Sequence, residues 1–177
     1  MADSLGHLRR RGQAALDVTR ASRAILAELQ IKADERSATS LPLALASMDT
    51  AEAIFALLLQ QPEQHWVAAL ALQRTQIEYV LRSAFFARAA SHRELMQFRR
   101  TGKMPTRGNR PIHLVDVAKE ACQHLGWEQT KLLLTVRSHQ RDLSGLIHGG
   151  GEVLAIYTQH ETWGGPHDRL GRTGTPG

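Results

Sequence analysis

The sequence predicts an all-α fold, a single-domain bundle of five to six helices. Aromatic residues make up only 5% of the chain, and aromatic and β-branched side chains are the ones that favour strands. Alanine, leucine and arginine, which favour helices, are abundant. Apolar residues also recur at the three- and four-residue spacing of an amphipathic helix. A chain of 177 residues suits one core, and we expect residues 1–162 to form the bundle.

The first three predicted helices cover residues 4–32, 42–60 and 63–90. Apolar or small side chains repeat at helical spacing in each of them, and Ser4 is a suitable N-cap for the first. A polar stretch separates the first helix from the second. We expect the second helix to begin at Pro42, because proline is favoured in the first helical turn.

A short fourth helix is predicted at residues 91–101. Ser91 and Glu94 have the Ser-x-x-Glu spacing of a capping box, and Gly102 follows as a helix stop. Residues 103–110 contain proline, glycine and asparagine, which predicts a loop, and we find no two-residue hairpin signal in the chain.

Two further helices are expected, at residues 111–125 and 128–148, with Gly126 between them as a helix stop. Residues 152–159 are a candidate for a short last element. From residue 163 to residue 177 the chain is polar and rich in glycine and proline, which predicts a disordered tail.

Composition indicates a soluble, cytoplasmic protein. The N-terminus has arginines but no apolar core of a secretory signal. The longest apolar runs, residues 53–59 and 67–72, are too short to span a membrane, so no membrane partner is expected. Cys122 is the only cysteine, which excludes an intramolecular disulfide and a cysteine-based metal cluster.

The chain is basic, with a net charge of +5 and a pI of about 10. Residues 88–110 contain seven basic residues and only one acid, Glu94. The basic residues are Arg88, Arg93, Arg99, Arg100, Lys103, Arg107 and Arg110. A second group is Arg9-Arg10-Arg11. These groups are either solvated surface or a contact surface for an anionic partner such as RNA.

The residues most suggestive of chemistry lie near the end of the last predicted helix. Arg141 and His148 are seven positions apart, so they project from one side of a helix, roughly 10 Å apart along its axis. Together an arginine and a histidine can hold a phosphate and move a proton at neutral pH. The apolar stripe of this helix is predicted to be Leu132, Val136, His139, Leu143, Leu146 and Ile147, and the other side to hold Arg137, Arg141, Ser144 and His148. The alternative interpretation is that these cations only offset the helix dipole.

Arg141, Asp142 and His148 resemble the Arg-x(4–6)-His signature of the HEPN superfamily (higher eukaryotes and prokaryotes nucleotide-binding). The resemblance implies a helical bundle that dimerises and cleaves RNA without a metal, in toxin–antitoxin or phage-defence systems. His148 would be the general acid or base and Arg141 would bind the phosphate, leaving a 2′,3′-cyclic phosphate. Asp142 would orient a neighbouring chain or arginine.

A broader likeness, to a group of small uncharacterised bacterial helical proteins, covers roughly residues 70–157. The matching residues are Arg74, Glu78 and Arg82, then residues 98–105, then His148-Gly149-Gly150. The chain departs from that group at Ser144-Gly145, where the group often has an Asn-Asp pair. Independently of this likeness, Glu78 is spaced to pair with both arginines. The three form either a structural ion-pair ladder or part of an anion-binding pocket.

Other chemistry finds little support. Glu120 and His124 are one residue too far apart for a ferritin-like di-iron motif. We also find no Walker loop and no Gly-x-Ser-x-Gly turn, so neither a metal nor a cofactor is expected. The sequence therefore predicts a metal-independent endoribonuclease, a homodimer with a possible antitoxin partner. The alternatives are a non-catalytic module that binds RNA, a small anion or a protein, and a purely structural dimer.

Overall fold

Helices form almost all of the computed structural model, which describes residues 2–31 and 33–147 and the side chains of residues 6–31 and 33–138. The predicted all-α class is confirmed. The α-helices are α1 (Ala2–Glu28), α2 (Ser37–Gln60), α3 (Pro62–Ala84), α4 (His92–Thr101), α5 (Leu114–Leu125) and α6 (Gln129–Ile147). A π-helical turn, η1 (Phe85–Ala89), follows α3, and a hairpin joins β1 (Thr106–Arg107) to β2 (Arg110–Pro111). The candidate element at 152–159 and the tail from residue 163 lie outside the described residues.

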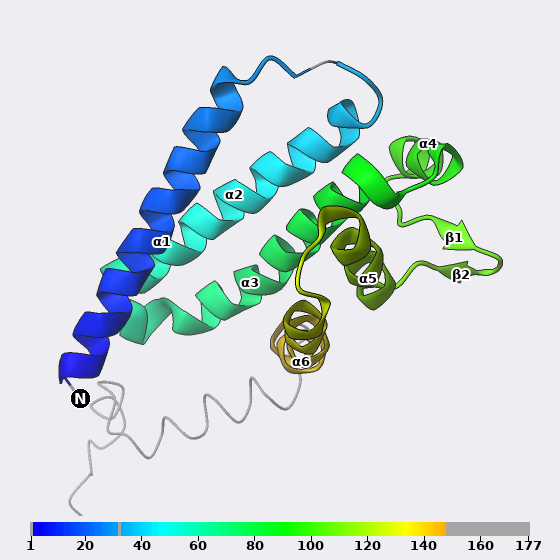
Figure 1. Ribbon diagram of the computed structural model, residues 1–177. Coiled ribbons are helices and arrows are strands. Elements are labelled where there is room, and N and C mark those ends of the chain that lie inside the picture. The colour runs from blue at the N-terminus through cyan, green and yellow to red at the C-terminus, as the bar shows by residue number, and fades with distance from the viewer. Residues whose placement is uncertain (1, 32, 148–177) are drawn as a thin grey trace, which may run out of the picture.

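The three N-terminal helices pack side by side, with α2 in contact with both α1 and α3 (Figure 1). Helices α5 and α6 pack against each other and against α3. The α4 helix and the hairpin lie at the opposite end of the molecule from the start of α1 (Figure 1). This arrangement gives the bundle an extended three-helix part and a more compact part around the end of α3.

The core lies in the compact part. Its fully buried side chains come from α3, η1, α4, α5 and α6, and include Leu81, Phe85, Phe86, Leu95, Val117 and Val136. Phe86 stacks on Phe98 with ring centroids 4.3 Å apart. On α6, Val136 is buried and Leu132 packs against the core, whereas Arg137 is exposed. The predicted two sides of this helix are confirmed as far as its side chains are described; His139, Leu143, Leu146 and Ile147 lie beyond that part.

The predicted starts of the first two helices are wrong. Helix α1 begins at Ala2, so Ser4 lies inside it instead of capping it. Helix α2 begins at Ser37, and Pro42 lies inside it. Asp34 is the reason for the early start of α2, because its Oδ1 accepts from the Ser37 N–H at 2.7 Å while the Ser37 Oγ accepts from the Asp34 N–H at 2.9 Å. This reciprocal pair satisfies two backbone donors, as a capping box does.

The predicted third helix is divided between α3 and the π turn η1. The Ala90 N–H donates to the Phe85 carbonyl at 2.9 Å, which is the i to i+5 bond of a π-helix. Arg36, just before α2, donates to the Phe86 carbonyl at 3.1 Å and to the Ala90 carbonyl at 2.7 Å. One guanidinium therefore satisfies two carbonyls at the end of this long helical segment and ties it to α2.

The predicted capping signals of the next segment are confirmed. Ser91 and Glu94 form a complete capping box at the start of α4, and Gly102 ends the helix with a φ of 67°. Gly126 ends α5 in the same left-handed conformation, with a φ of 66°. Such backbone angles cost a glycine little and other residues more.

The segment expected as a plain loop contains a two-residue antiparallel hairpin instead. Thr106 pairs with Pro111 and Arg107 with Arg110, across a turn in which Gly108 has a φ of 61°. Glycine at the first turn position with positive φ is the pattern of a type II′ turn, so the Gly-Asn dipeptide was the signal overlooked. Because Pro111 belongs to the hairpin, α5 begins at Leu114 and not at residue 111.

Helix α2 is the one helix of the described residues that could cross a membrane by length and composition, with a mean hydropathy of 1.5. It is longer than either apolar run noted in the sequence. A single such helix is weak evidence for a membrane span, although only 6% of its most apolar window is buried, unlike that of a core helix. Here α2 packs between α1 and α3, and its Asp49 and Glu52 form ion pairs with Arg23 of α1. These contacts fit a helix within a bundle.

Candidate functional site

The Arg–His motif falls at the end of the described chain. Helix α6 is continuous from Gln129 to Ile147, so the backbone at Arg141, Asp142 and Ser144 is helical, as predicted. Their side chains, and all of His148, lie outside the part that the structure describes. The proximity of Arg141 to His148 stays a prediction. The exposed Arg137 is the one member of the predicted polar side whose environment is seen.

Helix α6 packs against α3, the helix that holds the second predicted constellation. There the Nε of Arg74 lies 3.2 Å from the Oε1 of Glu78, and the Nη2 of Arg82 lies 2.8 Å from its Oε2. The prediction that Glu78 pairs with both arginines is confirmed. All three side chains are half-buried, with 23–28% of their surface exposed.

Arg82 has hydrogen-bonding capacity that this ladder does not use. Its Nε is buried and has no partner among the described residues. A buried donor without an acceptor is costly, whereas an anion or water at this position would satisfy it. The ladder thus bridges two turns of α3 and leaves one buried donor without an acceptor among the described residues.

A second ion cluster, which the sequence did not reveal, joins the hairpin to α4 and α5. The Nε of Arg107 donates to the Oε1 of Glu94 at 2.6 Å, and its Nη2 donates to the Oε2 of Glu120 at 2.9 Å. Burial alone would raise the pKa of Glu94, but hydrogen bonds from Arg107 and from the backbone and hydroxyl of Ser91 outweigh it and hold the pKa below its ordinary value. The two carboxylates raise the pKa of Arg107. Arg107 is therefore a fixed structural cation of the basic segment.

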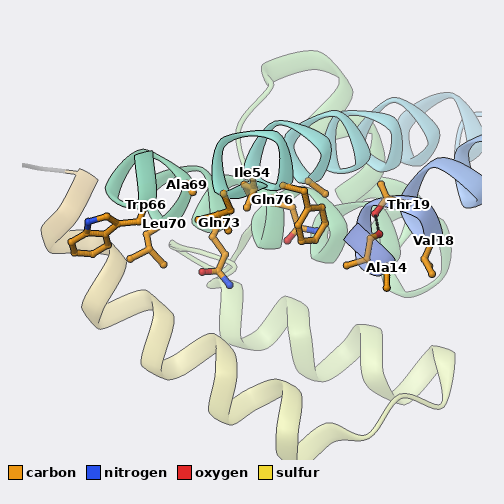
Figure 2. Close-up of a pocket in the computed structure, with 13 residues that line it drawn as sticks. Ala14, Val18, Thr19, Ile54, Trp66, Ala69, Leu70, Gln73 and Gln76 are labelled. Carbon is orange, nitrogen blue, oxygen red and sulfur yellow. Dashed lines mark hydrogen bonds between the residues drawn. The ribbon is translucent and has the colours of Figure 1, made fainter. Parts of the chain in front are cut away.

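A largely apolar groove with a volume of about 780 Å³ lies between α1, α2 and α3 (Figure 2). Val18 and Thr19 of α1, Ile54 of α2, and Trp66 and Leu70 of α3 are among the residues that line it. Its polar lining consists of Thr19, Gln73 and Gln76. Sequence periodicity could not predict this groove, because it arises from how far apart three helices pack.

Groups needed for other chemistries are scarce in the described part of the chain. No cluster of three or more histidine, cysteine or acidic side chains that could hold a metal ion occurs there. Cys122 is buried, and its burial raises the pKa of the thiol, which disfavours a reactive thiolate.

Comparisons of the chain with protein-family models, with curated proteins and with solved structures found no match. The class that the fold defines is an all-α helical bundle, and its function is inferred from its own residues.

Proposed function

We propose that this protein is a metal-independent endoribonuclease of the HEPN type, acting in the cytoplasm in a toxin or phage-defence role. The observation that carries the proposal is the position of Arg141 on α6. Arg141 follows the buried Val136 by five residues, which is about 140° around a helix axis, so it belongs to the side of α6 away from the core. His148 lies outside the described residues; seven residues after Arg141, it would return to nearly the same side if the helix continued by one residue.

The proposed reaction is an internal transesterification of RNA. One His148 imidazole removes the proton of a ribose 2′-hydroxyl, whose oxygen attacks the adjacent phosphorus. The bond from phosphorus to the 5′-oxygen breaks, and a second imidazolium, from His148 of a partner copy, protonates that oxygen. The products are a 2′,3′-cyclic phosphate and a 5′-hydroxyl. Arg141 stabilises the negative charge that gathers on the phosphoryl oxygens, with a guanidinium suited to binding two of them.

The α3 ladder supports this site in the proposal. Helix α3 packs against α6, and the Nε of Arg82 is a buried donor without a partner among the described residues. In the proposal, Glu78 holds Arg74 and Arg82 in place on the helix that packs against α6. Asp142 would orient an arginine of its own or a partner chain, and Arg137 and Ser144 would contact the RNA backbone.

The test is cleavage of a labelled single-stranded RNA in EDTA by the wild type and by His148→Ala and Arg141→Ala. We expect cleavage that survives the chelator, cyclic-phosphate ends, and loss of activity in both variants. Lys131→Ala is the matched control, because Lys131 is an exposed cation on the same helix, paired only with Glu128 in the described structure. Cleavage by both motif variants at the wild-type rate would contradict the proposal.

A dimer interface is supported by a separate observation. Val18 of α1 lines the groove of Figure 2 and is 66% exposed, and Leu8 and Ile25 of the same helix are also more than 60% exposed. Exposed apolar side chains on a helix that also lines an apolar groove suit a two-fold interface, in which the same surface of each copy forms the contact. We propose that a second copy of this chain docks here, which would bring two motifs to one RNA.

The oligomeric state tests this interface directly. Light scattering after size exclusion should give a dimer for the wild type and a monomer for Val18→Glu, which places a charge in the contact. A monomeric wild type would shift the proposal to the alternative function, a module that binds a protein partner such as an antitoxin, or RNA or a small anion, without catalysis.

A further inference from the structure

Several basic residues in and around α4 and the hairpin have no ion-pair partner among the described residues. Two of the seven basic residues of this segment have carboxylate partners: Arg107, in the cluster described above, and Arg99, whose Nη1 lies 3.9 Å from an oxygen of Glu35. The other five are exposed and form no ion pair with any described residue: Arg88, Arg93, Arg100, Lys103 and Arg110. Many other cations of the chain are paired, as Arg23 is with Asp49 and Lys131 with Glu128.

Two of these basic residues, Arg93 and Arg100 of α4, line one hollow. Arg93 and Arg100 are seven residues apart on α4, about 10 Å along its axis and nearly on the same side. Both line a polar hollow of about 930 Å³ that also contains Gln97 and Thr106. Its one acid, Glu35, is engaged by Arg99 and by the Nδ1 of His92 at 3.3 Å. The charges of Arg93 and Arg100 therefore remain available to a ligand.

The backbone that holds these arginines is firmly anchored. The capping box fixes the start of α4, and Phe98 stacks on the buried Phe86. Arg107 joins the hairpin to Glu94 of α4 and to Glu120 of α5. The positions from which the cations extend are thus set before any ligand arrives, which lowers the entropic cost of binding.

The character of this surface favours a polyanion held by its phosphates over a protein partner. Protein interfaces have an apolar centre, whereas protein–nucleic-acid interfaces are more polar and strongly positive. The only large apolar side chain lining the hollow is Met96. Arginine matches phosphate in geometry, because its planar guanidinium donates two parallel hydrogen bonds.

We infer that α4 and the β1–β2 hairpin form an RNA-holding surface, hereafter the α4 surface, that binds a single-stranded RNA by its phosphates and without regard to base sequence. Arg93 and Arg100, which line the polar hollow together with Thr106 of β1, are its central contacts. The inference rests on the proposed function for its ligand, and it assigns substrate holding to residues separate from the α6 motif.

The experiment measures the affinity of a labelled single-stranded RNA by fluorescence anisotropy, using protein that carries His148→Ala so that the RNA stays intact. Arg93→Ala/Arg100→Ala should lower affinity at least about tenfold at low salt. It should also reduce the slope of log affinity against log salt by about 1.4, since each lost phosphate contact on a single strand removes about 0.7. Arg20→Ala/Lys131→Ala removes equal charge at two exposed cations away from the α4 surface, and its affinity should stay within about twofold of the parent.

Each other outcome overturns the inference. Unchanged affinity in Arg93→Ala/Arg100→Ala would place RNA elsewhere, and an equal loss in the control pair would show binding through net charge alone. Binding of poly-glutamate but not RNA would indicate an acidic protein partner. The proposed function fails separately, if the chain with His148 intact binds RNA through the α4 surface without cleaving it.

Discussion

Glu94 offers the sharpest test of how the compact part of the bundle is held together. Its side chain is only 10% exposed, and its carboxylate accepts from the Ser91 N–H at 2.8 Å, the Ser91 hydroxyl at 2.9 Å and the Arg107 Nε at 2.6 Å. Glu94→Ala removes all three contacts at once. It thus removes the ion pair between the hairpin and α4 and the side-chain half of the capping box, while the backbone N–H of residue 94 can still donate to the Ser91 hydroxyl.

The expected loss follows from these contacts. A helix cap is worth about 1 kcal/mol, and a hydrogen bond to a charged group about 1.5–3 kcal/mol. Arg107 keeps Glu120 as a partner and is itself 49% exposed, so its charge stays paired and hydrated in the variant. Together these give a loss of about 2–4 kcal/mol in the free energy of unfolding. For a chain of this size that corresponds to a fall in Tm of roughly 10 °C.

Urea unfolding of the wild type, Glu94→Ala and Glu120→Ala measures the difference. The control removes the other carboxylate from Arg107, at a site that is more exposed, and should cost no more than about 1 kcal/mol. Equal losses in the two variants would refute the reasoning, because the capping contacts would then contribute nothing.

The same residue gives a pH dependence. The pKa of Glu94 is lower in the folded state than in the unfolded chain, so its stabilisation is present above the unfolded value of about 4.3 and is lost as the pH falls through the folded value. The difference in the free energy of unfolding between the wild type and Glu94→Gln should therefore become smaller below about pH 4. A difference that stays constant down to pH 2 would contradict the lowered pKa of Glu94.

Three further substitutions test the packing and the ion pairs, each by urea unfolding. Leu81→Ala, at a side chain with no exposed surface, should cost about 2–5 kcal/mol through lost burial and a cavity; a smaller loss would mean that the core collapses around the gap. Arg36→Ala leaves the Phe86 and Ala90 carbonyls without their donor and should cost about 2 kcal/mol, which Arg36→Lys should restore only in part. Glu78→Gln weakens two half-exposed pairs and should cost about 1 kcal/mol or less.

Helix starts and ends were predicted correctly where they depend on residues a few positions apart in the sequence. The capping box at Ser91 and Glu94 and the helix stops at Gly102 and Gly126 depend on neighbours in sequence, and all of them occur as predicted. The predicted start of α2 is wrong because Asp34, which accepts from the Ser37 N–H, stabilises a helix start at Ser37, five residues before Pro42. The hairpin was missed because its Gly-Asn turn sits among residues with no strand pattern.

The candidate site was predictable in part. The spacing of Arg74, Glu78 and Arg82 predicted their ion pairs, since contacts four residues apart follow from helix geometry alone. The bond from Arg107 to Glu94 and Glu120, and the groove between α1 and α3, join segments distant in sequence and needed the tertiary structure. The relation of Arg141 to His148 stays a prediction, beyond the described side chains.

The π turn at residues 85–89 constrains how the length of this chain can vary. It holds one residue more per turn than an α-helix, so a deletion within it would let the segment relax to regular α-helix and keep its backbone hydrogen bonds. Five residues of π-helix turn through about the same angle as four residues of α-helix, so the residues after the turn, and α4 with its arginines, would keep nearly the same direction. A deletion of one residue within a regular turn of α3 would instead rotate every following residue by about 100° around the helix axis. A single-residue deletion that preserves the fold should therefore be tolerated better at residues 85–89 than within α3.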